Sequence, residues 1–258
     1  MTFTDTNTLL LVVSGVCVAA ASGLIGSFLI LRRMTLLSDA LSHVALPGIA
    51  LGVIFKFEPL VGGLLFLFLS IFLIWGIEHR TKLAIESITG VLFVTALAVG
   101  SLLIEEHDLL EAFFGNVETI SSARAVIQTV LAIIVLVVTT LFFKRLVLVS
   151  VAPELTLAEK IRPSRMELLL LTLIALTISI GISFVGVLLM SALTIIPAAT
   201  ARNISKNLKG YISLSIAFAI IGLIGGIFIA KTYAINSGVA TVLISTSLFI
   251  VSLFWKRD

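Results

Sequence analysis

Long apolar runs without a charged residue divide this chain, and they constrain its fold more than any other feature. Seven such runs lie at about residues 9–31, 59–77, 87–104, 125–143, 185–201, 210–230 and 232–255. Each is long enough to cross or nearly cross a bilayer, which takes about 20 helical residues. Two further runs, 34–55 and 166–184, are apolar but carry Asp39 and His43 in the first and Glu167 at the edge of the second. The sequence therefore predicts an all-α polytopic membrane protein with about nine transmembrane helices.

The composition supports lipid as the solvent of this chain. Of its 258 residues, 59% are hydrophobic and 12% are charged, and the mean hydropathy is +1.24. Soluble domains are roughly half apolar and a quarter charged, so both a water-soluble fold and a disordered chain are excluded. Cys17, which lies in an apolar run, is the single cysteine of the sequence, so no disulfide can form within the chain. We expect residues 1–258 to form one transmembrane domain.

The placement of the basic residues predicts the orientation. No Lys or Arg precedes the first apolar run, so the chain lacks the basic region of a cleaved signal peptide. If the N-terminus is outside, only three of the 17 basic residues lie outside: Lys56, Arg124 and Lys231. That asymmetry satisfies the positive-inside rule and gives an N-outside, C-inside protein. It also favours two crossings over residues 166–201, although eight crossings in total remain the alternative if one segment is re-entrant.

Two loops are substantial. The outer loop, residues 105–125, is acidic and amphipathic, and its His107 stands among three carboxylates. A solvated loop with an incidental His explains this cluster better than a metal site does, and concentrating cations near the entrance is a weaker role that the acidic charges could still play. The inner loop contains APELTLAEKIRP, in which apolar residues recur at helical spacing between Pro153 and Pro163. We expect a short cytoplasmic helix within residues 153–163.

Asp39 and His43 are the most informative residues for function. An Asp inside a membrane segment costs about 2.5 to 3.5 kcal/mol, so something must compensate for it. At spacing i and i+4 the two side chains project from the same helical face, where they could share a zinc, manganese or iron ion. Two copies of the chain at a two-fold axis would supply four ligands. In the alternative interpretation, Asp39 caps or hydrogen-bonds the start of the helix and a neighbouring carbonyl satisfies His43; the residues alone leave both interpretations open.

Several enzyme classes find no support in the sequence. It contains no G-x-x-x-x-G-K-[ST] phosphate loop, no H-E-x-x-H, no nucleophile elbow and no paired Cys motif. The basic residues are scattered over short loops, which argues against nucleic acid binding. We therefore expect no catalytic residues and no enzyme activity in this chain.

Three segments resemble one known family. The segment LILRRMTLLSDALSHVALPGIALG, residues 29–52, closely resembles the permease subunits of ABC importers for zinc, manganese and iron. The segments GVLLMSALTIIPAATAR and APELTLAEKIRP fit two further parts of the same family, so the resemblance spans most of the chain. Two departures stand out: Ser38 replaces a common Gly, and Asn236 stands where Pro is usual.

The resemblance implies a type II-like permease in the bacterial plasma (inner) membrane that moves a divalent metal ion into the cell. Asp39 and His43 take the position of the family's metal-coordinating pair, with the ion as substrate and no stably bound cofactor. The implied partners are cytoplasmic ATPase subunits, an extracytoplasmic metal-binding protein and a second permease, as a homodimer or with a close paralogue. The helix within 153–163 would be the coupling helix, contacting the ATPase through Glu154, Leu155, Ala158 and Glu159.

Alternatives of other kinds are compatible with the same residues. In a proton-coupled secondary metal carrier, Asp39 and His43 would relay protons and no ATPase would take part. An ABC permease for a metal chelate, such as a siderophore or cobalamin, would need a wide apolar cavity instead of a small ion site. A membrane scaffold that transports nothing is disfavoured by the acid within residues 34–55.

Overall fold

The computed structural model describes residues 6–81, 83–103, 120–156, 159, 161–187 and 189–255. Within these residues all regular secondary structure is helical, which confirms the predicted fold class. The elements are α1 (Thr6–Leu31), α2 (Thr35–Ile54), α3 (Pro59–Thr81), α4 (Ile85–Leu103), α6 (Ser122–Leu141), α7 (Phe143–Val151), η2 (Pro153–Thr156), α8 (Pro163–Val185), α9 (Met190–Ile204), α10 (Leu208–Tyr233) and α11 (Ser237–Leu253).

Each of the nine predicted runs coincides with a helix among these. Seven helices (α1, α2, α3, α4, α6, α8 and α10) are long and apolar enough to cross a membrane, whereas α9 and α11 have 15 and 17 residues. The number of crossings and the orientation stay predictions.

Residues 166–201 contain two helices and not one long kinked helix. Helix α8 ends at Val185 because Gly186 takes a φ of 81°, a left-handed conformation that favours glycine. The next helix begins at Met190, five residues later than the run that starts at residue 185 suggests. The inner loop, expected from Lys144 to Arg165, is also shorter, because α7 continues the chain as a helix immediately after Phe142.

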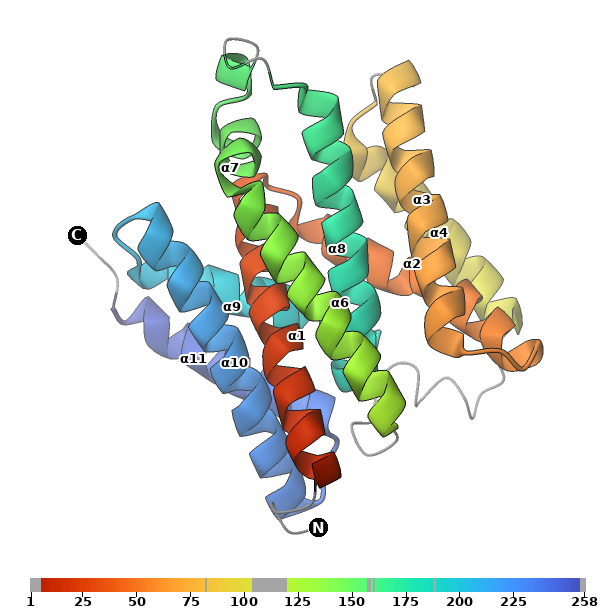
Figure 1. Ribbon diagram of the computed structural model, residues 1–258, viewed down its shortest axis with the longest axis vertical. Coiled ribbons are helices and arrows are strands. Elements are labelled where there is room, and N and C mark those ends of the chain that lie inside the picture. Colours follow the sequence, from red (N-terminus) through yellow and green to blue (C-terminus); the bar gives the residue numbers. More distant parts are fainter. Residues whose placement is uncertain are drawn as a thin grey trace.

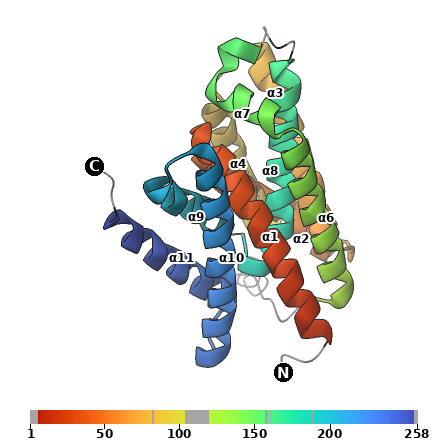
Figure 2. The same ribbon diagram turned by 60° about the vertical axis from the view of Figure 1, so that its left-hand side comes forward.

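The helices form a bundle with α1, α6 and α8 between two outer groups (Figure 1). Helices α2, α3 and α4 pack together on one side, and α9, α10 and α11 on the other. In Figures 1 and 2, the end of α1, helix α7 and the start of α10 all lie toward the end of the bundle opposite the N-terminus. Basic residues follow or occupy each of these segments, so we call this end the basic end.

Glycines allow several helices to approach one another closely. A Cβ at Gly48 of α2 would collide with the backbone carbonyl of Gly62 in α3, and a Cβ at Gly62 would collide with that of Gly48. Small residues at such crossings let helix backbones touch in lipid, where no hydrophobic effect drives association. The contact holds α2, which carries Asp39 and His43, directly against α3.

One partly buried ion pair ties the residue after α1 to α8 near the basic end. Arg32 Nη2 donates to Glu167 Oε1 at 2.8 Å, and the two side chains are only 17% and 13% exposed. A charge-assisted hydrogen bond in such a site is stronger than an exposed pair. It also accounts for Glu167, the acid at the edge of the predicted run 166–184.

Candidate metal site

A tight turn after α1 leads into the helix that carries Asp39 and His43. Arg33 takes a φ of 59°, which ends α1, and α2 begins two residues later at Thr35. Helix α2 is largely enclosed by its neighbours. Asp39 and His43 therefore lie one and two turns into a buried helix, close to the basic end.

Asp39 faces α9. Its side chain is half-buried, and its Oδ1 accepts a hydrogen bond from Ser191 Oγ at 3.0 Å. The N-cap position of α2 is Met34, so Asp39 does not cap the helix. A hydrogen bond from a neutral hydroxyl leaves the carboxylate its charge and further lone pairs for a cation.

His43 faces α4. Its ring packs edge-on against Phe93, with centroids 5.2 Å apart and an interplanar angle of 69°. The side chain is 8% exposed, and among the described residues its Nδ1 has no hydrogen-bond partner. In the alternative interpretation of the sequence a carbonyl satisfies His43, and no carbonyl of the described chain does so at this nitrogen.

One chain supplies an incomplete set of metal ligands. Among the described residues, no three His, Cys, Asp or Glu side chains lie close enough together to hold an ion. Structural zinc sites use four protein ligands, whereas Asp39 and His43 offer two. Water, a second copy of the chain or both would have to complete the shell. His107 and most of the outer loop lie outside the described residues.

The sequence did not reveal the neighbours of the pair. Ser191 is 152 residues from Asp39, and nothing in its spacing links it to α2. It does fall within GVLLMSALTIIPAATAR, one of the three segments that carry the family resemblance. The contact of Phe93 with His43 could not be predicted from the sequence, because aromatic residues are common in apolar helices, where they face the core or the lipid.

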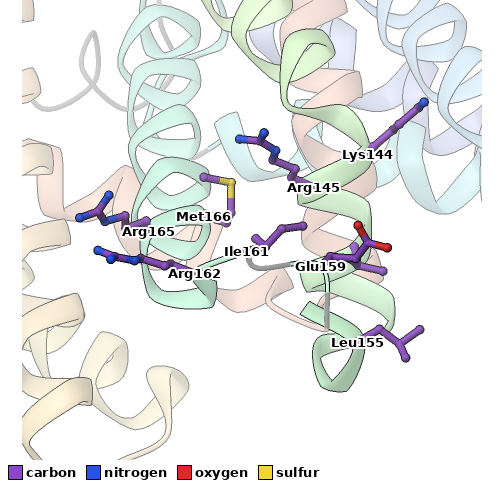
Figure 3. Close-up of a pocket in the computed structure, with 9 residues that line it drawn as sticks. Lys144, Arg145, Leu155, Glu159, Ile161, Arg162, Arg165 and Met166 are labelled. Carbon is purple, nitrogen blue, oxygen red and sulfur yellow. The ribbon is translucent and has the colours of Figure 1, made fainter. Parts of the chain in front are cut away.

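The predicted coupling segment borders a groove at the basic end (Figure 3). Glu154 and Leu155 are exposed on η2, and Glu159 is exposed just beyond it, whereas Ala158 lies outside the described residues. The groove has a volume of about 930 Å³. Figure 3 shows Leu155 and Glu159 on its α7 and η2 side and Arg162 and Arg165 at the start of α8. The regular secondary structure described within 153–163 is the single turn η2 and, from Pro163, the start of α8.

Comparison with known proteins decides the family. Residues 5–256 match the ABC 3 transport family. The chain belongs to this family. It is 32% identical over 251 residues to the high-affinity zinc uptake system membrane protein ZnuB of Haemophilus influenzae, covering 95% of each chain. It is 33% identical over 246 residues to the manganese import system permease protein ScaB of Streptococcus gordonii, covering 94% of this chain and 88% of that one.

A solved structure agrees with these relatives. The chain superposes on PsaBC from Streptococcus pneumoniae in complex with Fab with a TM-score of 0.87 at 29% identity, covering 98% of this chain and 93% of that one. The ABC 3 membership confirms the resemblance drawn from the three sequence segments. The protein is therefore an ABC importer permease, a multi-pass transport protein of the bacterial inner membrane.

Proposed function

We propose that this ABC 3 permease forms the path of a divalent transition-metal ion into the cell, and that Asp39 and His43 bind the ion transiently. The observation that carries the proposal is a carboxylate and an imidazole one turn apart on a buried membrane helix. Intramembrane ionisable residues mark ion pathways by default. The relatives named for zinc uptake and manganese import support the same class of substrate.

The ligand chemistry suits a passing ion better than a resident one. Two ligands from one chain give a weak site, and conduction needs binding that is favourable enough to enter and weak enough to leave. One carboxylate and one imidazole accept zinc, manganese or ferrous iron. A second permease copy would bring another Asp39 and His43 to the path.

The remaining partners act at the two ends of the bundle. We infer that ATPase subunits dock at the basic end against the coupling segment, with Glu154, Leu155, Ala158 and Glu159 in contact. The exposed Leu155 offers apolar surface for such a partner, and the groove beside it adds the basic side chains of Lys144, Arg145, Arg162 and Arg165. An extracytoplasmic binding protein would deliver the ion at the opposite end.

ATP-driven uptake in proteoliposomes tests this function. The permease, co-purified with its ATPase, is reconstituted and given radioactive Mn²⁺ or Zn²⁺ with ATP on the ATPase side. We expect accumulation that needs hydrolysable ATP and persists when a protonophore collapses the proton gradient. Accumulation driven by a proton gradient without ATP would instead identify a secondary carrier and contradict the proposal.

Removing the Ser191 hydroxyl should weaken ion binding. Ser191→Ala takes away the hydrogen bond that orients Asp39, and bonds to charged groups are worth about 1.5 to 3 kcal/mol. We expect the KM for metal uptake to rise about tenfold, since about 1.4 kcal/mol corresponds to a factor of ten. Ser42→Ala is the matched control because its hydroxyl bonds only the Ser38 carbonyl in the described chain. Equal KM values for the two variants would exclude an orienting role for Ser191.

A further inference from the structure

A small cavity opens beside Asp39, between helices α2 and α4. Its volume is about 220 Å³, enough for an ion with several waters. Helices α2 and α4 line it with Leu36, Leu37, Asp39, Ala40, Glu86, Thr89, Gly90 and Phe93. Three of these side chains carry oxygen: Asp39, Glu86 and Thr89. The cavity therefore joins the candidate ligand Asp39 to two polar groups that have no role in the binding of the ion by Asp39 and His43.

The face of α4 that borders this cavity is aligned with the metal pair on α2. Glu86, Thr89 and Phe93 follow one another at spacings of three and four residues, which places them on one helical face. Phe93 packs against His43, so it fixes the level of α4 relative to α2. Thr89 and Glu86 then lie progressively closer to the basic end, where α4 begins.

The hydroxyl of Thr89 makes no hydrogen bond within the described bundle. The side chain is 3% exposed, and its Oγ1 is buried without a hydrogen-bond partner among the described residues. Threonines in helices usually donate to the carbonyl four residues earlier. Thr95, on the same helix, does so to Val91 at 2.8 Å, and the buried Thr139 and Thr177 do the same in α6 and α8. The hydroxyl of Thr89 therefore has no partner among the described residues, and the side chain that carries it lines the cavity.

Glu86 adds a negative charge at the mouth of the cavity. It stands in the first turn of α4, it is exposed, and no ion pair within 4 Å engages it among the described residues. A carboxylate in a first turn also stabilises its helix through the dipole, which is the competing explanation for its position. That explanation accounts for Glu86 but not for the unpartnered hydroxyl of Thr89.

We propose that Asp39, Thr89 and Glu86 form a release station for a partly hydrated divalent cation, on the basic-end side of the Asp39 and His43 pair. The station rests on the proposed function, since it receives the ion that the pair binds. The ion leaves the His43 nitrogen, keeps the Asp39 carboxylate and gains the Thr89 oxygen and water, while Glu86 attracts it through water. Because no three acidic or His side chains of the described chain enclose an ion, waters fill the rest of its shell.

The donor set of the station favours one kind of ion. Carboxylate, hydroxyl and water oxygens suit manganese, whereas imidazole nitrogen suits zinc. Exit through an all-oxygen station should therefore be easier for Mn²⁺, and damage to the station should affect Mn²⁺ most. Damage to the station should lower the maximal rate of uptake, because the station acts after the ion has bound at Asp39 and His43.

Thr89→Val and Glu86→Gln in the reconstituted permease–ATPase complex test the station with Mn²⁺ and Zn²⁺ as probes. Valine matches threonine in shape and replaces the hydroxyl with a methyl group. We expect the maximal rate of Mn²⁺ uptake to fall about tenfold in each variant with little change in KM, and Zn²⁺ uptake to fall less. Thr89→Ser should restore the rate. Thr95→Val is the matched control on the same helix and should transport as the wild type does.

Three results would overturn the station. Wild-type Mn²⁺ rates for Thr89→Val and Glu86→Gln, together with lost uptake in Asp39→Ala, would remove the station and leave the proposed function intact. Wild-type uptake by Asp39→Ala would remove both. A fall in melting temperature that parallels the fall in rate, without rescue by Thr89→Ser, would assign the two residues a structural role only.

Discussion

Asp39→Asn and His43→Phe should each lower ATP-driven metal uptake more than about 100-fold. Changes to the groups that merely support metal ligands cost about 10- to 100-fold, so the loss of a ligand itself should exceed that. Asparagine keeps the size of aspartate and an oxygen that can accept from Ser191, but it lacks the charge that attracts a cation. Phenylalanine keeps a ring that can pack on Phe93 and removes both nitrogens. The first variant therefore removes the charge of the carboxylate and the second removes the imidazole nitrogens, each with little change in packing.

Initial uptake rates and equilibrium metal binding in the membrane, measured on the same complex, check this expectation. The melting temperature of each variant should stay within a few degrees of the wild type, because no buried volume is lost. Ser42→Ala, which removes a hydroxyl of the same helix that donates to the Ser38 carbonyl and to neither ligand, should retain uptake. Wild-type uptake by both ligand variants would show that Asp39 and His43 are not on the ion path.

Gly26→Ala should strongly destabilise the permease, although it adds only one methyl group. A Cβ at Gly26 of α1 would collide with the backbone carbonyl of Thr194 in α9. Because the obstacle is backbone, a side-chain rotation cannot relieve it, and the two helices must separate. Overpacking of this kind costs about 1 to 3 kcal/mol and occasionally more. Ser191 lies one turn before Thr194 on α9, so we expect the variant to lose metal affinity as well as stability.

The melting temperature of the detergent-solubilised protein and the yield of assembled complex measure this effect. Gly76→Ala on α3 is the matched control, since nothing lies within 4 Å of the position of its Cβ. Alanine is preferred over glycine inside helices by about 1 kcal/mol, so the control should melt at or slightly above the wild-type temperature. Equal melting temperatures for the two variants would mean that α1 and α9 do not touch at Gly26.

Much of the fold is local and was predictable. Every apolar run became a helix, because a chain in lipid must satisfy its backbone polar groups internally and a helix does so within one segment. The one break that changed a boundary, at Gly186, depends on a φ of 81° that many glycines could adopt but few do. The residues around Gly186 alone permit two helices or one kinked helix, and the charge placement favours two. The structure has two, because α8 ends at Val185 and α9 begins at Met190.

Part of the candidate site was likewise predictable from the sequence, and part was not. Asp39 and His43 could be found from the sequence because charge is scarce in this chain, and a carboxylate in an apolar run is expensive enough to stand out. Ser191, Phe93 and Thr89 could not, because each is an ordinary residue whose significance depends on what lies opposite it. Thr89 differs from Thr95 only in its surroundings.

The sequence by itself determined the class of protein, its helical segments, the family and the two residues proposed as metal ligands, because hydropathy, helical spacing and family motifs act within short stretches of chain. Only the tertiary structure decided that Asp39 accepts a hydrogen bond from Ser191, that His43 packs on Phe93 and that Gly26 meets Thr194. These contacts join residues that are far apart in the chain. They depend on close packing among helices, which no local sequence pattern encodes.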